Sequence, residues 1–255
     1  MKKGLSIVIS IILFAIIGVL AWQVIKSIQA PIKFNNEQKV RENKVIERLI
    51  DIRNAEVLYK NAHNKYTDNF DTLIKFCKYD SIPVVEMFSK RNDADSTYYT
   101  VYDTAGYIKV MDSIRKGNVI RKDRAKKEGW DDAAGWNKLV FEINDIKYVP
   151  FSEPQQMFEL EAGTKESSGV KVPVFEARTP YEVYLGKTGA SFSDKEWTQR
   201  VKNLKAEKES INRYAGLKVG SMDEASTEGN WEKLYTFRMN DGITEPLYLA
   251  IRRGV

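Results

Sequence analysis

The side chains that most often carry out nucleophilic catalysis are scarce in this 255-residue chain. It has one histidine, His63, and one cysteine, Cys77. A Ser-His-Asp triad or a Cys-His dyad would have to use His63. This histidine lies in the polar segment HNKYTDN, for which a solvated turn is the simpler interpretation. A zinc site needs several clustered ligands, which the sequence does not provide. A single cysteine also allows no disulfide within the chain, so we expect ordinary packing to stabilise the fold.

Paired carboxylates are the other candidates for chemistry. Glu159 and Glu161 lie two residues apart, and Asp131 and Asp132 are adjacent. Two carboxylates can hydrolyse a glycosidic bond, but pairs on strands and turns usually belong to solvated faces. The run GLKVG (216–220) lacks the Lys-Ser/Thr ending of a phosphate-binding loop. We therefore predict no catalytic residues, no cofactor-binding residues, no metal site and no cofactor, and we expect a protein that is not an enzyme.

The charge pattern argues against nucleic acid as a partner. The formal net charge of +5 is spread along the chain, and no basic cluster is interleaved with aromatic residues. The segment 115–127 (RKGNVIRKDRAKK) holds seven basic residues and one acid, Asp123. Such a segment can touch an anionic lipid or polymer, although a solvated loop or helix face is the simpler interpretation.

The most apolar part of the chain is the charge-free run of 22 residues from Gly4 to Ile25. As a helix it would be about 33 Å long, enough to cross a bilayer core of roughly 30 Å. A cleaved signal peptide is the alternative, but its apolar region is usually about 7 to 15 residues long. The bulky Ile28 and the following Pro31 also disfavour cleavage after Ala30. We predict a retained single-pass anchor with the lipid bilayer as its partner.

The orientation of this anchor depends on two opposing signals. Basic residues near the run are more numerous on its C-terminal side, which favours a cytoplasmic main domain. A very short N-terminal tail before a long hydrophilic domain is instead typical of a signal anchor that exports its C-terminal side. We favour the second interpretation, which gives a single-pass protein of the inner (cytoplasmic) membrane with a periplasmic or extracytoplasmic domain.

Two helices are expected to follow the anchor. Pro31 predicts a break or kink, after which Asn35 or Asn36 can cap a helix that continues to about Asn61. Its apolar residues recur at steps of three and four, which is the pattern of a helix that lays a broad face on a core. Six charged residues are expected on its remaining surface: Lys44, Glu47, Arg48, Asp51, Arg53 and Glu56. A turn then leads to a short helix over 70–76, capped by Asp68 or Asn69.

The first 76 residues resemble type IV pilins and type II secretion pseudopilins. The resemblance is carried by IRNAEVLYKNAHNKYTDNFDTLIKF (52–76), which follows a membrane helix and an amphipathic helix. The matching positions are Ile52, Ala55, Tyr59, Tyr66 and Leu73. The resemblance implies an architecture, with protein partners in an envelope assembly. Ile9 stands where the family has a glutamate that registers neighbouring subunits, so the resemblance does not extend to that contact.

The rest of the chain predicts a mixed and then β-rich region. Residues 97–102 are rich in strand formers, 105–114 fits a helix or a second strand, 129–136 is a turn-rich segment, and 146–151 suggests a short strand. The strongest hairpin signal pairs FELEAG (158–163) with VKVPVFEA (170–177) across a Gly/Ser turn. Pro173 within it indicates an edge strand or a bulge. Further elements are expected over the following ranges: a strand at 181–185, a helix from Lys195 to about Tyr214 capped by Ser193 or Asp194, and strands in LKV, LYTFRM and LYLAIRR.

Together these patterns predict an α+β protein with mostly antiparallel strands. We divide it into a cytoplasmic tail and transmembrane anchor (1–30), a helical and mixed α/β membrane-proximal region (31–150) and a β-rich α/β region (151–255). The favoured function is a non-enzymatic cell-envelope protein that presents a binding or assembly domain, with protein partners in the envelope. The alternatives are a membrane-tethered hydrolase acting on cell-wall or glycan material and an anchored cytosolic adaptor.

The length of the apolar run gives a first testable prediction. We expect the mature protein to retain Trp22, because the run is too long and its end too bulky for signal cleavage. Intact-mass measurement of the protein purified from membranes checks this. A mass that corresponds to a start near Pro31 would show that the run is removed.

Overall fold

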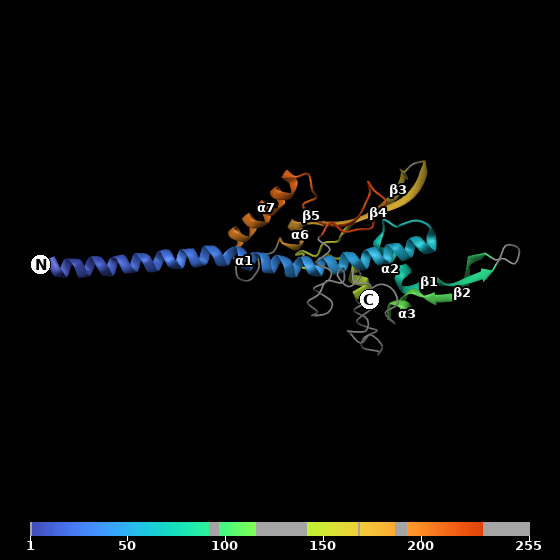
Figure 1. Ribbon diagram of the computed structural model, residues 1–255, viewed down its shortest axis with the longest axis horizontal. Helices are drawn as coiled ribbons and strands as arrows, with labels where there is room; N and C mark the ends of the chain where they lie inside the picture. Colours follow the sequence, from blue (N-terminus) through green and yellow to red (C-terminus); the bar gives the residue numbers. More distant parts are fainter. Residues whose placement is uncertain (1, 92–96, 116–141, 168, 187–192, 232–255) are drawn as a thin grey trace.

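One long helix runs through the length of the molecule, and the other elements gather around its second half (Figure 1). The computed structural model describes residues 2–91, 97–115, 142–167, 169–186 and 193–231. The elements in chain order are α1 (Lys2–His63), α2 (Phe70–Tyr79), β1 (Ser81–Arg91), β2 (Tyr98–Lys109), α3 (Val110–Arg115), η1 (Asp145–Lys147), β3 (Glu159–Ser167), β4 (Val170–Pro180), α6 (Tyr181–Tyr184), α7 (Asp194–Ser210) and β5 (Gly216–Ser221). The predicted mixture of helices and antiparallel strands is confirmed.

Helix α1 is continuous for 62 residues with Pro31 inside it. Of the two predicted effects of Pro31, a break or a kink, the break does not occur. Proline removes one backbone hydrogen bond and crowds the preceding turn, at a cost of about 3 kcal/mol in a helix interior. The long helical stretches on both sides of Pro31 outweigh that local loss, and residues 35 and 36 lie inside the helix rather than at a cap. The apolar run and the amphipathic segment therefore form one rod.

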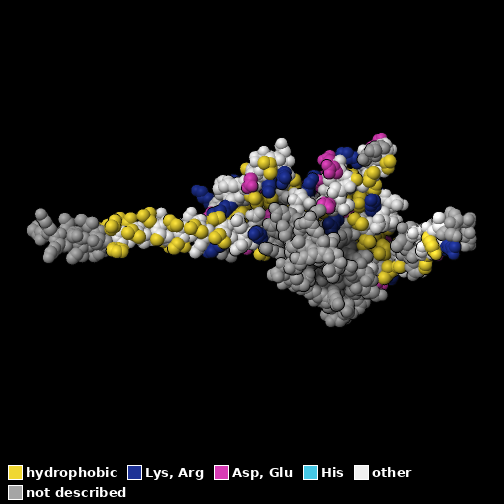
Figure 2. All heavy atoms as spheres, viewed as in Figure 1, with side chains coloured by type: hydrophobic (Ala, Val, Ile, Leu, Met, Phe, Trp, Pro, Cys, Tyr) yellow, Lys and Arg dark blue, Asp and Glu magenta, His cyan; other side chains and the backbone are white. Residues whose placement is uncertain are grey.

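The first part of α1, from its start to Lys33, projects away from the body (Figure 1). Its large apolar side chains from Ile12 to Ile28 are 49–76 % exposed, and they cover the projecting rod in Figure 2. From its start to Lys33 this part is about 48 Å long. Within the described residues, α1 is the one helix long and apolar enough to cross a membrane.

The second part of α1 supplies the central face of the core. Val45, Leu49, Ile52 and Ala55 are fully buried at steps of three and four residues, as the periodicity predicts. They belong to one cluster with side chains from α2, α3, α6, α7 and the three-stranded sheet. That cluster joins residues from both sides of position 150, including Ile143 and Phe175.

The turn after α1 and the cap of α2 form as expected. Asn69 is the N-cap, and its Oδ1 accepts hydrogen bonds from the backbone N–H groups of Asp71 (2.8 Å) and Thr72 (3.1 Å). These bonds satisfy donors that the first turn of a helix leaves free. Strands β1 and β2 then pair antiparallel, with a register shift between Val84 and Val85. The stretch 105–114 ends β2 and begins α3, so both of its expected conformations occur.

The strongest hairpin signal is confirmed as β3 and β4, to which β5 adds on the other side of β4. Leu160, Phe175 and Ala177 face the core, while the glutamates between them point outward. This is the period-two pattern of a half-buried sheet. Pro173 pairs only with Thr164, because the β4–β5 pairing covers Phe175–Pro180. Strand β4 is thus an edge at Pro173, where a missing N–H costs little.

Three local predictions are wrong or need new bounds. Residues 146–151 form the end of the 3-10 helix η1 and one isolated bridge, Tyr148 to Met157, instead of a strand. The expected strand at 181–185 is helix α6, which directly follows Pro180. Helix α7 is capped by Ser193 but ends at Ser210, earlier than expected. The turn-rich segment 129–136, most of the basic segment 115–127, and both LYTFRM and LYLAIRR lie outside the described residues.

The packing of α1 yields a second prediction. Ile52→Ala should lower the free energy of unfolding by about 2–5 kcal/mol, because it opens a cavity in the centre of the core. The matched control, Val40→Ala, changes an α1 residue that is 57 % exposed and should cost less than about 1 kcal/mol. Urea unfolding of the detergent-solubilised full chain measures both. Equal effects of the two substitutions would contradict the central position of this face.

Candidate functional site

A cavity lies between α1, α7 and β5, with Tyr181 of α6 in its wall. It holds about 570 Å³, within the usual range of small-molecule sites. Its walls come from these three elements, from Tyr181 at the start of α6 and from the segments that follow α7 and β5. They are Gln38, Glu42, Ile46, Tyr181, Leu204, Lys208, Asn212, Arg213, Tyr214, Gly216, Leu217, Lys218, Asn230 and Trp231.

Arg41 of α1 holds together the helices beside the cavity. Its side chain is 7 % exposed, and it pairs with Glu37 (2.9 Å) and donates to the carbonyl oxygen of Tyr184 (3.2 Å). Its guanidinium also lies 4.9 Å from the ring centre of Trp197, in the range of a cation–π contact. Arg41 therefore joins α1 to both α6 and α7, the helices that frame one side of the cavity.

Asn230 positions the opposite side. Its Oδ1 accepts from the Lys218 N–H (2.9 Å), and its Nδ2 donates to the Gly216 carbonyl (2.9 Å). With the backbone bridge between Val219 and Gly229, these bonds pair residues 228–230 with the free edge of β5. Gly220 has φ +77°, and a Cβ there would lie 2.3 Å from the Phe175 carbonyl oxygen. Glycine at this end of GLKVG serves the close approach of β5 to β4, not the binding of a phosphate.

The electrostatic character of the cavity comes from its buried and basic groups. Burial raises the pKa of Glu42, whose Oε1 accepts a hydrogen bond from Gln38 (2.8 Å). Burial also raises the pKa of Tyr181 and of Tyr214 to about 12, so both phenols stay neutral. Lys208, Arg213 and Lys218 bring positive charge to the lining. The cavity is therefore basic, with neutral phenols in its wall.

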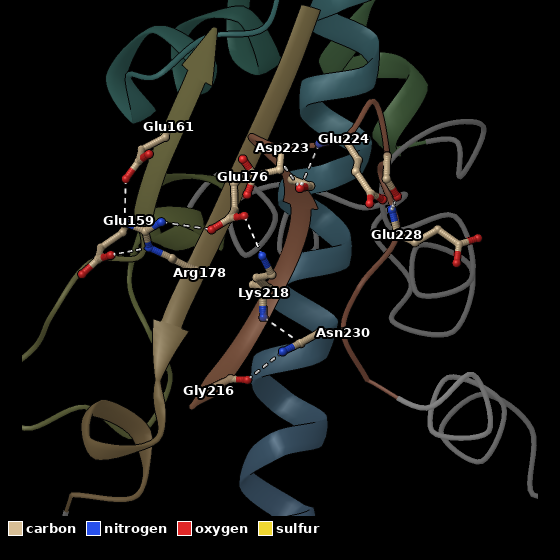
Figure 3. Close-up of polar contacts among 12 residues, drawn as sticks. Glu159, Glu161, Glu176, Arg178, Gly216, Lys218, Asp223, Glu224, Glu228 and Asn230 are labelled. Atoms are coloured by element: carbon tan, nitrogen blue, oxygen red, sulfur yellow. Dashed lines mark hydrogen bonds and ion pairs between the residues drawn. The ribbon is translucent and has the colours of Figure 1, made fainter. Parts of the chain in front are cut away.

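The outer face of the sheet carries an ion-pair network that shares Lys218 with the cavity (Figure 3). Arg178 contacts Glu159 (2.7 Å), Glu161 (2.6 Å) and Glu176 (3.0 Å), and Lys218 contacts Glu176 (2.8 Å). Although desolvation opposes it, bonding to Lys218 and Arg178 lowers the pKa of Glu176. The network crosses β3, β4 and β5 and joins the strands through their polar faces.

The other candidate residues weighed from the sequence do not meet in one place. Glu159 and Glu161 both bond to Arg178. His63 lies against Tyr59, with its Nε2 3.8 Å from an Asp80 oxygen, at the end of α1. Cys77 is buried in the core, and Asp131 and Asp132 are outside the described residues. The described residues also contain no group of three His, Cys, Asp or Glu that can hold a metal ion.

Two acids on α1 were expected on its surface and are instead buried. Asp51 is 3 % exposed and Glu56 is 0 % exposed. Glu56 accepts a hydrogen bond from the Thr67 N–H (3.0 Å), in the turn that leads to α2. Burial raises its pKa to about 8, and the nearby Asp68 adds to the shift. The turn covers this side of α1, which helical periodicity alone does not indicate.

Comparison with family models, curated proteins and solved structures gave no match to the chain. The residues of the cavity themselves indicate its chemistry. A basic cavity with neutral phenols, amides and an indole can hold a polar ligand by charge and by ring contact. The cavity between α1, α7 and β5 is thus the candidate functional site, and binding is the activity its groups best support.

Glu56 gives a prediction for the pH dependence of stability. Its folded pKa, about 8, lies above the ordinary glutamate value of 4.5, so the folded chain keeps a proton that the unfolded chain releases. Stability should therefore fall as pH rises from about 4.5 to 8, and this loss should be absent in Glu56→Gln. Between pH 5.5 and 8 we expect the wild type to lose about 1–3 kcal/mol more than the variant.

Urea unfolding of the solubilised full chain at the two pH values measures this difference. The exposed Glu166→Gln on β3 is the control, and it should follow the wild type. A Glu56→Gln variant with the same pH slope as the wild type would show that Glu56 is ionised in the folded protein.

Proposed function

We propose that this protein is a non-enzymatic, membrane-anchored component of the cell envelope that presents its α/β body for binding or assembly. The single observation that carries the proposal is the continuity of α1. One part of this helix is apolar and uncovered, and the other part is the centre of the core. A helix with those two environments joins a lipid phase to a water-soluble body.

The exposed face of α1 supports lipid as its surroundings. An uninterrupted apolar surface of this length is costly in water. Between Ile12 and Ile25 it carries no charged side chain, which fits a span without a proton-relay or ion-transport role. Trp22 and Gln23 near its end fit the polar boundary of a bilayer.

Assembly with other envelope proteins is the role we favour for the body. The proposal includes a pilin-like arrangement, supported by a helix that projects on one side and lies beside an antiparallel sheet on the other. Gly18 has no other atom within 4 Å of where a Cβ would stand, and with Ala21 it forms a small-residue face. A second helix can approach closely there, as small residues allow in membranes.

We place the anchor in the inner (cytoplasmic) membrane and the body on the periplasmic or extracytoplasmic side. Lys2 and Lys3, on the N-terminal side of the apolar run, fit a cytoplasmic end of the anchor. Binding is favoured over glycan hydrolysis because Glu159 and Glu161 are both held by Arg178, an arrangement that secures strands. An anchored cytosolic adaptor would have the opposite orientation, which experiment can separate.

The anchor is tested by a pair of matched double substitutions. Ile16→Asp with Val19→Asp places two acids inside the apolar run, at about 2.5–3.5 kcal/mol each near its centre, and should move the protein out of the carbonate-washed membrane fraction. Ile32→Asp with Val40→Asp changes residues of similar exposure on the same helix beyond the run, and should stay in that fraction. Equal partitioning of the two variants would refute the anchor.

The orientation is tested by protease treatment of intact spheroplasts that express a C-terminally tagged chain. We expect the tag and the body to be digested without lysis. Protection of the body until the membrane is opened would instead establish the cytosolic adaptor.

A further inference from the structure

We propose that the cavity between α1, α7 and β5 binds a sugar-sized organic carboxylate of the hexuronate class. The cavity has three properties that point to this ligand: a volume of about 570 Å³, two cations without an ion pair in the described structure, and a wall of aromatic rings. The inference goes beyond the proposed envelope role, and it does not depend on which side of the membrane the body occupies.

The lining carries three cations, Lys208, Arg213 and Lys218, against one carboxylate, Glu42, which feels the charge of Lys208 and whose pKa is raised by burial. Lys218 is engaged by Glu176 at 2.8 Å, so that pair is balanced. Among the described residues, no ion pair engages Lys208 or Arg213. Arg213 lines the cavity and is exposed. A guanidinium in that position can take both oxygens of a carboxylate at once.

Part of the cavity lining is apolar and aromatic. Tyr181 and Tyr214 line it with neutral phenols, and Trp231 and Leu204 add flat and aliphatic surface. Trp231 is held in place because its ring lies directly over Gly229. Aromatic rings beside a few hydrogen-bonding groups suit a ring-shaped ligand with polar edges, and hexose rings have that form.

The height of the cavity along α1 argues against a lipid headgroup as the natural source of the anion. Gln38 is the lining residue nearest to the apolar run, and it follows Ile25 by 13 residues. Along an upright helix this separation is about 20 Å, whereas the polar layer on each side of a bilayer is roughly 5–8 Å thick. A soluble or polymer-borne sugar acid reaches the cavity, and a phospholipid of the same membrane does not.

The test is calorimetric titration of the full chain in an uncharged detergent. Three probes separate the chemistries: sodium D-glucuronate, D-glucose and glycerol 3-phosphate, the last as a lipid-headgroup fragment. We expect saturable binding of glucuronate with a Kd at or below about 1 mM, and binding of the other two that is at least about tenfold weaker. Absence of saturable glucuronate binding overturns the proposal, and tighter binding of glycerol 3-phosphate overturns the carboxylate assignment.

Substitutions then locate the site. Arg213→Ala should weaken glucuronate binding at least about tenfold, and Arg213→Lys should restore part of it, since lysine keeps the charge but lacks the paired donors. Lys195→Ala removes an exposed lysine at the other end of α7 and is the control, with unchanged affinity expected. Because Arg213 is exposed, its loss should leave the unfolding midpoint unchanged. Equal affinities of Arg213→Ala and Lys195→Ala would place the binding elsewhere.

Discussion

The packing of one face of α1 is the constraint on which the rest of the structure depends. Among the described elements, α1 contacts α2, α6, η1, β4 and β5, and its buried side chains share one core cluster with them. The described strands and helices around it are short, and an isolated hairpin or a helix of a few turns is marginal in water. Burial against α1 gives each of them the apolar contact that it lacks alone, so the sheet and helices are stable together with the rod.

This arrangement also places polar groups where water cannot reach them. Arg41, Glu42, Asp51 and Glu56 are all buried on the same helix. Arg41 offsets its desolvation through an ion pair, a carbonyl and an indole ring. Glu42 and Glu56 reduce the cost of their own desolvation by holding a proton more tightly, as their raised pKa values indicate. The same helix therefore contains the main stabilising face and the main pH-sensitive groups of the molecule.

Sequence reasoning succeeds here wherever a local rule dominates. The caps at Asn69 and Ser193 and the hairpin of β3 and β4 follow from side chains next to their own backbone. It fails at Pro31, where the long helix on both sides outweighs a local breaker. It also fails at 181–185, where a strand-like composition forms a helical turn against α1 and α7.

The cavity could not be predicted from the sequence. Its lining comes from α1, the end of α7, β5 and residues 230–231, and no periodicity or motif places these segments together. The burial of Glu56 has a weak signal, since the polar turn after His63 must fold back over the end of its helix. Only the observed bond from the Thr67 N–H shows which side chain that turn covers.

The absence of a break at Pro31 has a mechanical consequence. With no break between the rod and the body, a lean of α1 in the proposed bilayer would move the folded part with it. Membrane helices commonly lean by about 20°, and over the roughly 57 Å from Ile25 to His63 such a lean would shift the far end of α1 sideways by about 20 Å. Bilayer thickness affects the tilt of a membrane helix, so it would also affect how far the sheet and hairpins are displaced along the plane of the membrane.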